Sequence, residues 1–193
     1  MKIAKVNRMS RDAFVAAFGG VFEHSPWVAE RAFVACPFVD ADALHAAMMD
    51  VVNAATRDEQ LALLRAHPDL AGKEARAGTM TNASVAEQAS AALDRLLPAE
   101  MARIADLNAA YRAMHGFPFI IAVRHYTRDG ILHEFARRLT RDSENEIAEN
   151  LRQILAITRM RLSRMFDHVE TGSAAAEPTA SSTAANPHSS LPA

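Results

Sequence analysis

The chain has few cysteines, few glycines and no surplus of either charge. Cys36 is the single cysteine among 193 residues, so no disulfide can form within the chain. Stability must then come from a hydrophobic core, and a reducing compartment, the cytoplasm, is expected. The 21 basic and 23 acidic side chains give a formal charge of -2, without the basic field that attracts nucleic acids or anionic lipids.

A long hydrophobic run is also lacking. The N-terminal segment, MKIAKVNRMSRD, has no continuous apolar stretch, and the longest uncharged apolar-rich run covers residues 113–123. A membrane span needs about 20 such residues. Neither export nor membrane insertion is therefore expected.

Alanine, the strongest helix former, makes up about a fifth of the chain, whereas glycine numbers only 7. With 50% hydrophobic and 23% charged residues, this composition predicts a globular all-α protein. One core-forming stretch suggests a single compact domain at residues 1–169. Residues 170–193 are rich in Ala, Ser, Thr and Pro, which predicts a disordered, flexible tail or the stub of an interdomain linker.

Capping residues predict where the helices begin. Single capping residues precede amphipathic stretches at Ser10, Ser25, Asp40 and Thr127, and capping boxes begin at Thr56, Ser84 and Ser143. The last helix is expected to reach about Val169. Residues 69–82 are predicted to form a loop or one short helical turn, and residues 117–123 a short, buried, extended segment.

The common motifs for nucleotides and metals are absent from the sequence. It contains no G-x-G-x-x-G or G-x-x-x-x-G-K-[ST] loop and no H-E-x-x-H pair, and the lone Cys36 cannot form a cysteine zinc site. The histidines are scattered without a compact ligand spacing. We therefore expect no metal site.

Three segments differ from ordinary helical sequence. His67 to Lys73 places a histidine before a proline at the mouth of a loop, although the helix dipole alone also favours a histidine at a helix C-terminus. Ser84 to Gln88 places a glutamate at a helix start, where a capping box needs no catalytic purpose. Gly116 to Arg124 is an apolar run that ends on a charge, which a simple crossing of the core would also explain.

Together with Ser25 to Glu30 and Leu107 to Arg112, these segments resemble the OHCU decarboxylase family in order and approximate spacing. Members of that family decarboxylate 2-oxo-4-hydroxy-4-carboxy-5-ureidoimidazoline (OHCU) during urate breakdown. The resemblance covers about Met9 to Phe166. It implies an all-α domain of about eight helices, a homodimer that needs no metal or organic cofactor, and (S)-allantoin as the product.

The resemblance also implies the site residues. It places the catalytic histidine at His67, its partner glutamate at Glu87 and a functional arginine at Arg161, with Arg159 and Arg164 close in register. The implied substrate-binding residues are Pro68, Ser84, Val85, Ala86, Glu87, Gln88, Phe119, Ile120, Ile121, Ala122 and Val123. Two pairs, Met114-His115 and His125-Tyr126, depart from the family pattern at positions expected to lie at the rim of the pocket.

On this assignment His67 carries the proton that completes the reaction, and Glu87 either holds the histidine tautomer or contacts the substrate hydroxyl. The charge of Glu87 would also favour protonated His67. Arg161 would neutralise the anionic substrate, Gln88 would bind its ureido group, and backbone groups of residues 120–123 would bind the ring amides. The substrate ring can itself accept the electron pair left by CO₂, so no cofactor is required.

Two other functions are compatible with the sequence. The chain could be a helical interaction protein that keeps this scaffold without catalysis, in which case no pocket should contain both His67 and Glu87. It could instead be a cofactor-free hydrolase or tautomerase of a related ureide, which would keep the pocket but release no CO₂.

Overall fold

The structure, a computed structural model, describes residues 1–93 and 95–167, and the regular elements in this part are all helical. This confirms the all-α prediction. The α-helices are α1 (Ile3–Val6), α2 (Arg11–Phe18), α3 (Trp27–Ala32), α4 (Ala41–Asn53), α5 (Arg57–Arg65), α6 (Lys73–Ala77), α7 (Asn82–Ser90), α8 (Pro98–His115), α9 (Arg128–Arg138) and α10 (Ser143–Asp167), and the 3₁₀ turns are η1 (Phe33–Ala35) and η2 (Val123–His125). The predicted tail, residues 170–193, and the predicted helix end near Val169 lie outside the described residues.

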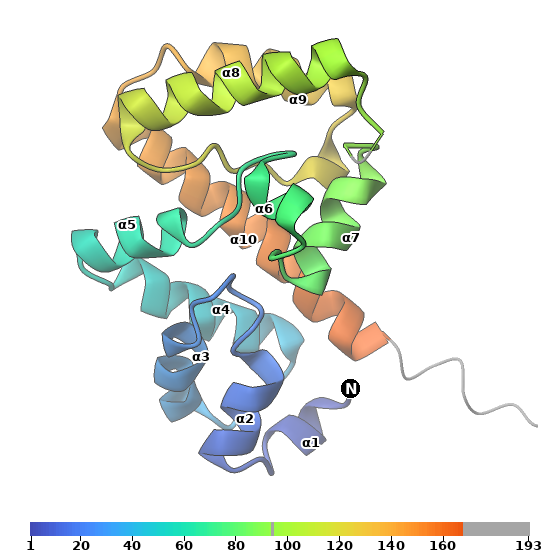
Figure 1. The fold of residues 1–193 in the computed structure, drawn as a ribbon. Coiled ribbons are helices and arrows are strands. Elements are labelled where there is room, and N and C mark those ends of the chain that lie inside the picture. The colour runs from blue at the N-terminus through green and yellow to red at the C-terminus, as the bar shows by residue number, and fades with distance from the viewer. Residues whose placement is uncertain (94, 168–193) are drawn as a thin grey trace, which may run out of the picture.

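The long helix α10 runs through the molecule from one end to the other (Figure 1). At one end α8 and α9 lie across it, and at the other it meets the group formed by α1 to α4, while α6 and α7 lie between. A buried apolar cluster joins both ends, from Phe14 and Phe18 through Met48 and Leu64 to Ile154. Within the described residues, no helix is both long enough and apolar enough to cross a membrane.

Several predicted helix starts are confirmed because they depend on local hydrogen bonds. The side chains of Ser10, Asp40 and Thr127 accept hydrogen bonds from the backbone N–H three residues later. Thr56 forms the predicted capping box with Glu59 at the start of α5. His67 follows the C-terminal end of this helix.

The other capping predictions are wrong. Helix α7 begins before Ser84, with Thr81 as its cap, so Ser84 lies inside the helix. At the start of α10 it is Asp142, not Ser143, whose side chain accepts from the backbone N–H three residues on. The Ser25 hydroxyl donates to the backbone carbonyl of Glu23 instead of capping α3. In each case a neighbouring residue or a longer-range contact replaced the local pattern.

Residues 117–123 form the predicted short, buried crossing between α8 and η2. Gly116 ends α8 with φ 77°, a left-handed conformation that favours glycine. The segment that follows is irregular, and its side chains from Phe119 to Val123 are at most 5% exposed. The predicted loop at residues 69–82 contains the one-turn helix α6.

Candidate active site

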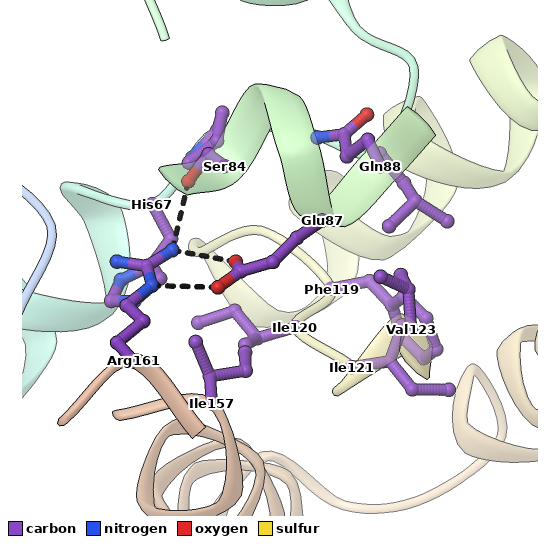
Figure 2. Close-up of a pocket in the computed structure, with 12 residues that line it drawn as sticks. His67, Ser84, Glu87, Gln88, Phe119, Ile120, Ile121, Val123, Ile157 and Arg161 are labelled. Atoms are coloured by element: carbon purple, nitrogen blue, oxygen red, sulfur yellow. Dashed lines mark hydrogen bonds and ion pairs between the residues drawn. The ribbon is translucent and has the colours of Figure 1, made fainter. Parts of the chain in front are cut away.

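A narrow cavity with a volume of about 40 Å³ lies where α5, α7, α10 and the buried crossing meet (Figure 2). The residues that line it come from the loop after α5, from α7, from the crossing and from α10: His67, Pro68, Leu70, Ser84, Glu87, Gln88, Phe119, Ile120, Ile121, Val123, Ile157 and Arg161. The structure therefore brings together in one place the three segments that the sequence singled out.

His67 follows the last turn of α5 and is 6% exposed. Its Nδ1 lies 2.9 Å from the backbone carbonyl oxygen of Leu63. Because a carbonyl can only accept, Nδ1 carries the hydrogen, and in the neutral imidazole the lone pair is then on Nε2. Nε2 is buried without a hydrogen-bond partner among the described residues. The site thus holds a basic nitrogen with a free lone pair.

Burial lowers the pKa of His67 to about 4, against an ordinary value near 6.5. The hydrogen bond to Leu63 and the charge of Glu23 oppose this shift, while the positive charge of Arg161 adds to it. At neutral pH the imidazole is uncharged. Our expectation of a protonated His67 favoured by Glu87 was therefore wrong, as was the idea that Glu87 holds its tautomer, because Leu63 does so.

Glu87 instead pairs with Arg161, in a geometry with two parallel hydrogen bonds (Figure 2). Nε of Arg161 donates to one carboxylate oxygen at 2.8 Å, and Nη2 donates to the other at 2.7 Å. Both residues are 7% exposed. This is the strong, directional arrangement in which an ionised carboxylate and a guanidinium fix each other.

All five N–H groups of the Arg161 guanidinium have acceptors. Besides the two bonds to Glu87, Nη2 donates to Ser84 Oγ at 3.0 Å, and Nη1 donates to the carbonyl of Val21 at 3.1 Å and to a Glu23 carboxylate oxygen at 2.9 Å. These partners raise the pKa of Arg161 despite its burial, which acts to lower it. Arg161 can contact a substrate only by giving up one of these acceptors.

Glu23 is the residue of this cluster that the sequence analysis missed. It lies in the turn between α2 and α3 and is fully buried. Burial acts to raise the pKa of its carboxyl, but the charge of Arg161 and hydrogen bonds from Ser84 and Thr81 outweigh burial and lower it. With both glutamates ionised, the cluster around one guanidinium carries a net negative charge. The local signal was weak: an acid directly after the apolar pair Val21-Phe22.

Gln88 lines the cavity, yet its amide is bonded to the loop that carries His67 and Pro68. Its Oε1 accepts from the backbone N–H of Ala71 at 2.8 Å, and its Nε2 lies 3.4 Å from the carbonyl oxygen of Asp69. Asn108 of α8 binds the same loop, because its Nδ2 donates to the carbonyl of Leu70 at 2.9 Å. The loop is therefore held from two helices.

Side chains of α10 hold the buried crossing that forms the opposite wall. Asn150 accepts from the backbone N–H of Ile120 at 3.1 Å, and Gln153 accepts from that of Ala122 at 2.9 Å. One turn further along, Ile157 lines the cavity, and Arg161 follows after another turn. One face of α10 thus carries both the wall supports and the guanidinium.

The sequence of residues 7–163 matches the model of the family described as OHCU decarboxylase. The chain belongs to the OHCU decarboxylase family. Curated relatives include the 2-oxo-4-hydroxy-4-carboxy-5-ureidoimidazoline decarboxylase of Haloferax volcanii, 43% identical over 86% of this chain and 96% of the relative. A uric acid degradation bifunctional protein of Bacillus subtilis is 38% identical over 81% of this chain and 31% of its own length.

Solved structures agree with this membership. A crystal structure of an (S)-allantoin synthase superposes with a TM-score of 0.68 at 31% identity, covering 85% of this chain and 54% of that one. A crystal structure of an OHCU decarboxylase in the presence of (S)-allantoin has a TM-score of 0.62 at 20% identity, covering 76% of this chain and 95% of that one, and shows the shared fold.

Most residues assigned by resemblance to the OHCU decarboxylase family line the cavity, but three do not. Val85 is 46% exposed, Ala86 is also exposed, and Ala122 is fully buried but does not line the cavity. Of the three candidate arginines, Arg161 is the one at the cavity. Arg159 instead forms an exposed ion pair with Asp42 at 3.0 Å.

The two departures from the OHCU decarboxylase pattern lie away from the cavity. Met114 is 53% exposed, and His115 is buried with its Nδ1 2.9 Å from Ser143 Oγ. Neither they nor His125 and Tyr126 line the cavity. In the part of the chain that the structure describes, no group of three His, Cys, Asp or Glu side chains could hold a metal ion.

Proposed function

We propose that this protein decarboxylates OHCU to (S)-allantoin, with His67 as the group that moves the proton. The observation that carries this assignment is the buried, unpartnered Nε2 of a neutral His67 in a cavity shared with Glu87. The activity fits the family to which the chain belongs. It makes the protein a carboxy-lyase of urate degradation.

The names of substrate and product define the proton transfers. Carbon 4 of OHCU bears a hydroxyl and the carboxylate, and carbon 5 bears the ureido group. When CO₂ leaves, the bonding pair moves into the ring, where the adjacent C=N accepts it and that ring nitrogen takes a proton from solvent. The C4 hydroxyl then loses its proton to become a carbonyl, and C5 gains a proton. The substrate acts as its own electron sink, so we propose that no cofactor takes part.

Neutral His67 suits both remaining transfers. Its Nε2 can take the proton from the C4 hydroxyl and, once protonated, return it to C5. A buried imidazolium with so low a pKa is a strong acid and gives the proton up readily. Since the backbone carbonyl of Leu63 fixes the ring, Nε2 approaches C5 from one face only, and this would set the (S) configuration.

We assign Glu87 to the binding of substrate N–H or O–H groups and Arg161 to the positioning of Glu87. A carboxylate is an acceptor on both oxygens and keeps lone pairs free after its bonds to Arg161. Because the five Arg161 donors are taken, a role in holding Glu87 fits better than direct neutralisation of the substrate carboxylate. The apolar side chains of Phe119, Ile121 and Ile157 would keep the cavity dry.

The decisive experiment couples urate oxidase and hydroxyisourate hydrolase to this protein and follows allantoin chirality by circular dichroism, together with CO₂ release. We expect faster formation of the (S) enantiomer. His67→Asn should lower kcat by about 1000-fold while leaving far-UV helicity unchanged. Substantial decarboxylation by that variant would exclude the role of His67. Turnover of a ureide without CO₂ would instead favour the hydrolase or tautomerase.

The alternative of a non-catalytic interaction protein predicted that no pocket would contain both His67 and Glu87, and one cavity is lined by both. From the family resemblance we also propose a homodimer that acts in the cytoplasm. Light scattering on the purified chain tests the first point: a monomeric mass at micromolar concentration would contradict it. Cell fractionation tests the second.

A further inference from the structure

We infer that Glu23 is a positioning residue for the decarboxylation, acting through Arg161 and Ser84 on Glu87. This inference rests on the proposed function and extends it to a residue that does not line the cavity. Glu23 is fully buried, charged and bonded to three side chains of the site region, although it is distant from all of them in sequence.

The two carboxylate oxygens of Glu23 have separate tasks. Oε2 accepts from Arg161 Nη1 at 2.9 Å and from Ser84 Oγ at 2.8 Å. Oε1 accepts from the hydroxyl of Thr81 at 2.8 Å. Thr81 is the cap of α7, and Ser84 lies in the first turn of that helix. Glu23 therefore ties the start of α7 to the guanidinium carried by α10.

This tie fixes the place of Glu87. Arg161 holds Glu87 through Nε and Nη2, and it can do so in one orientation only if Nη1, on the other side of the planar guanidinium, is also held. Glu23 and the Val21 carbonyl provide that hold. Without the Glu23 charge, the guanidinium would lose an ionic partner and Glu87 its fixed support.

The same charge acts on His67. Among the charged groups around the imidazole, Glu23 favours its protonated form, while Arg161 and His24 disfavour it. Glu23 thus opposes the desolvation that makes His67 so weak a base. A residue that merely filled space in the core would have no such effect on the titration of His67.

The test compares Glu23→Gln, which keeps the shape but removes the charge, with Glu23→Asp, which keeps the charge but shortens the reach. We expect each to lower kcat about 10- to 100-fold with KM within about twofold, because Glu23 positions the site without contacting substrate. In Glu23→Gln, NMR titration should show a further fall in the His67 pKa. Glu144→Gln, which removes an exposed carboxylate, is the matched control.

Two results would overturn the inference: wild-type kcat in folded Glu23→Asp, or wild-type kcat in Glu23→Gln with an unchanged His67 titration. If Glu23→Gln fails to fold, Glu23→Asp decides the matter alone. Neither result would contradict the decarboxylase function, because that function is tested separately by the kcat of His67→Asn and by the release of CO₂. If His67→Asn kept its activity and no CO₂ were released, the inference about Glu23 would lose its basis as well.

Discussion

Two buried arginines, Arg138 and Arg161, occupy very different environments in the same domain. Arg138 is fully buried, and its guanidinium donates to Glu146 at 2.9 Å, to the carbonyl of Ile120 at 2.8 Å and to Asn150 at 2.5 Å. It also lies over the ring of Phe119, with 4.5 Å from Cζ to the ring centroid. Arg161 meets two carboxylates and borders a cavity.

The difference lies in the balance of charge. Around Arg138, the fully buried Glu146 carboxylate pairs with two guanidinium groups, that of Arg138 at 2.9 Å and that of the partly exposed Arg141 at 3.2 Å, and the other acceptors of Arg138 are neutral. Around Arg161, two carboxylates share one guanidinium beside an uncharged histidine. A buried carboxylate whose charge is fully compensated in a filled core serves the fold, whereas a surplus of negative charge at a cavity costs stability and provides groups for chemistry.

Removal of the fully buried Arg138 cation should have the largest effect on stability. Arg138→Met removes the fully buried guanidinium that pairs with Glu146 and leaves only the partly exposed Arg141, 3.2 Å from the other carboxylate oxygen, so we expect the free energy of unfolding to fall by about 3–5 kcal/mol. Urea denaturation measures this loss. The adjacent Arg137→Met is the control, because Arg137 is half-exposed and its pair with Glu134 should contribute little. If Arg138→Met and Arg137→Met lowered the free energy of unfolding by similar amounts, the buried ion pair would contribute no more to stability than the exposed one.

Removal of one carboxylate should affect stability and kcat differently in the two clusters. Glu87→Gln leaves Arg161 balanced by Glu23, so stability should change little while kcat falls about 100-fold. Glu146→Gln leaves Arg138 without its buried carboxylate partner and should mainly destabilise the fold. Chemical denaturation and the coupled allantoin assay on both variants provide the comparison. If Glu87→Gln fails to fold, or if Glu87→Gln and Glu146→Gln lose the same amount of stability and of kcat, both clusters are structural.

The low pKa of His67 predicts an unusual pH dependence. The neutral form is the active base, and a pKa of about 4 keeps the imidazole neutral as pH falls from 7 to 5. We therefore expect kcat/KM to change less than about twofold over that range, and to be lost only as pH falls through the His67 pKa. NMR titration of His67 gives an independent value. Loss of activity near pH 6.5 would mean that the histidine is not desolvated.

The smallest effects should come from the arginines next to Arg161 in sequence. Arg159 and Arg164 are exposed, and Arg159 pairs with Asp42 at the surface. Arg159→Gln and Arg164→Gln should keep kcat within about twofold of wild type and leave the melting temperature nearly unchanged. A large loss of kcat in either variant would indicate that Arg159 or Arg164, and not Arg161, is the functional arginine of α10.

Local features were predictable from sequence, whereas the polar clusters were not. The caps at Ser10, Asp40, Thr56 and Thr127 depend on atoms three residues away, and all four predictions are confirmed. The capping boxes predicted with Glu87 and Glu146 are wrong, because a buried arginine on another helix binds each carboxylate: Arg161, 74 residues away, binds Glu87, and Arg138 of α9 binds Glu146. A local pattern cannot reveal a partner of that kind.

The candidate site shows the same division. The segments of His67, Glu87 and the crossing stand out in the local sequence, but their roles in one common site were predicted only from the family resemblance, which carries long-range information that periodicity lacks. Glu23 belongs to no periodic pattern, and its partners Thr81, Ser84 and Arg161 lie 58, 61 and 138 residues away. The pKa of His67 depends on burial, which the sequence around Pro68 does not disclose.

Helix α10 sets a limit on how this protein can vary in length. One face carries the carboxylate for Arg138, the supports of the crossing, a wall of the cavity and the guanidinium, in the order Glu146, Asn150, Gln153, Ile157 and Arg161. Insertion or deletion of one residue among them would rotate everything beyond it by about 100° about the helix axis. Substitutions on the outer face are compatible with this register, but a change in the number of residues between Glu146 and Arg161 is not.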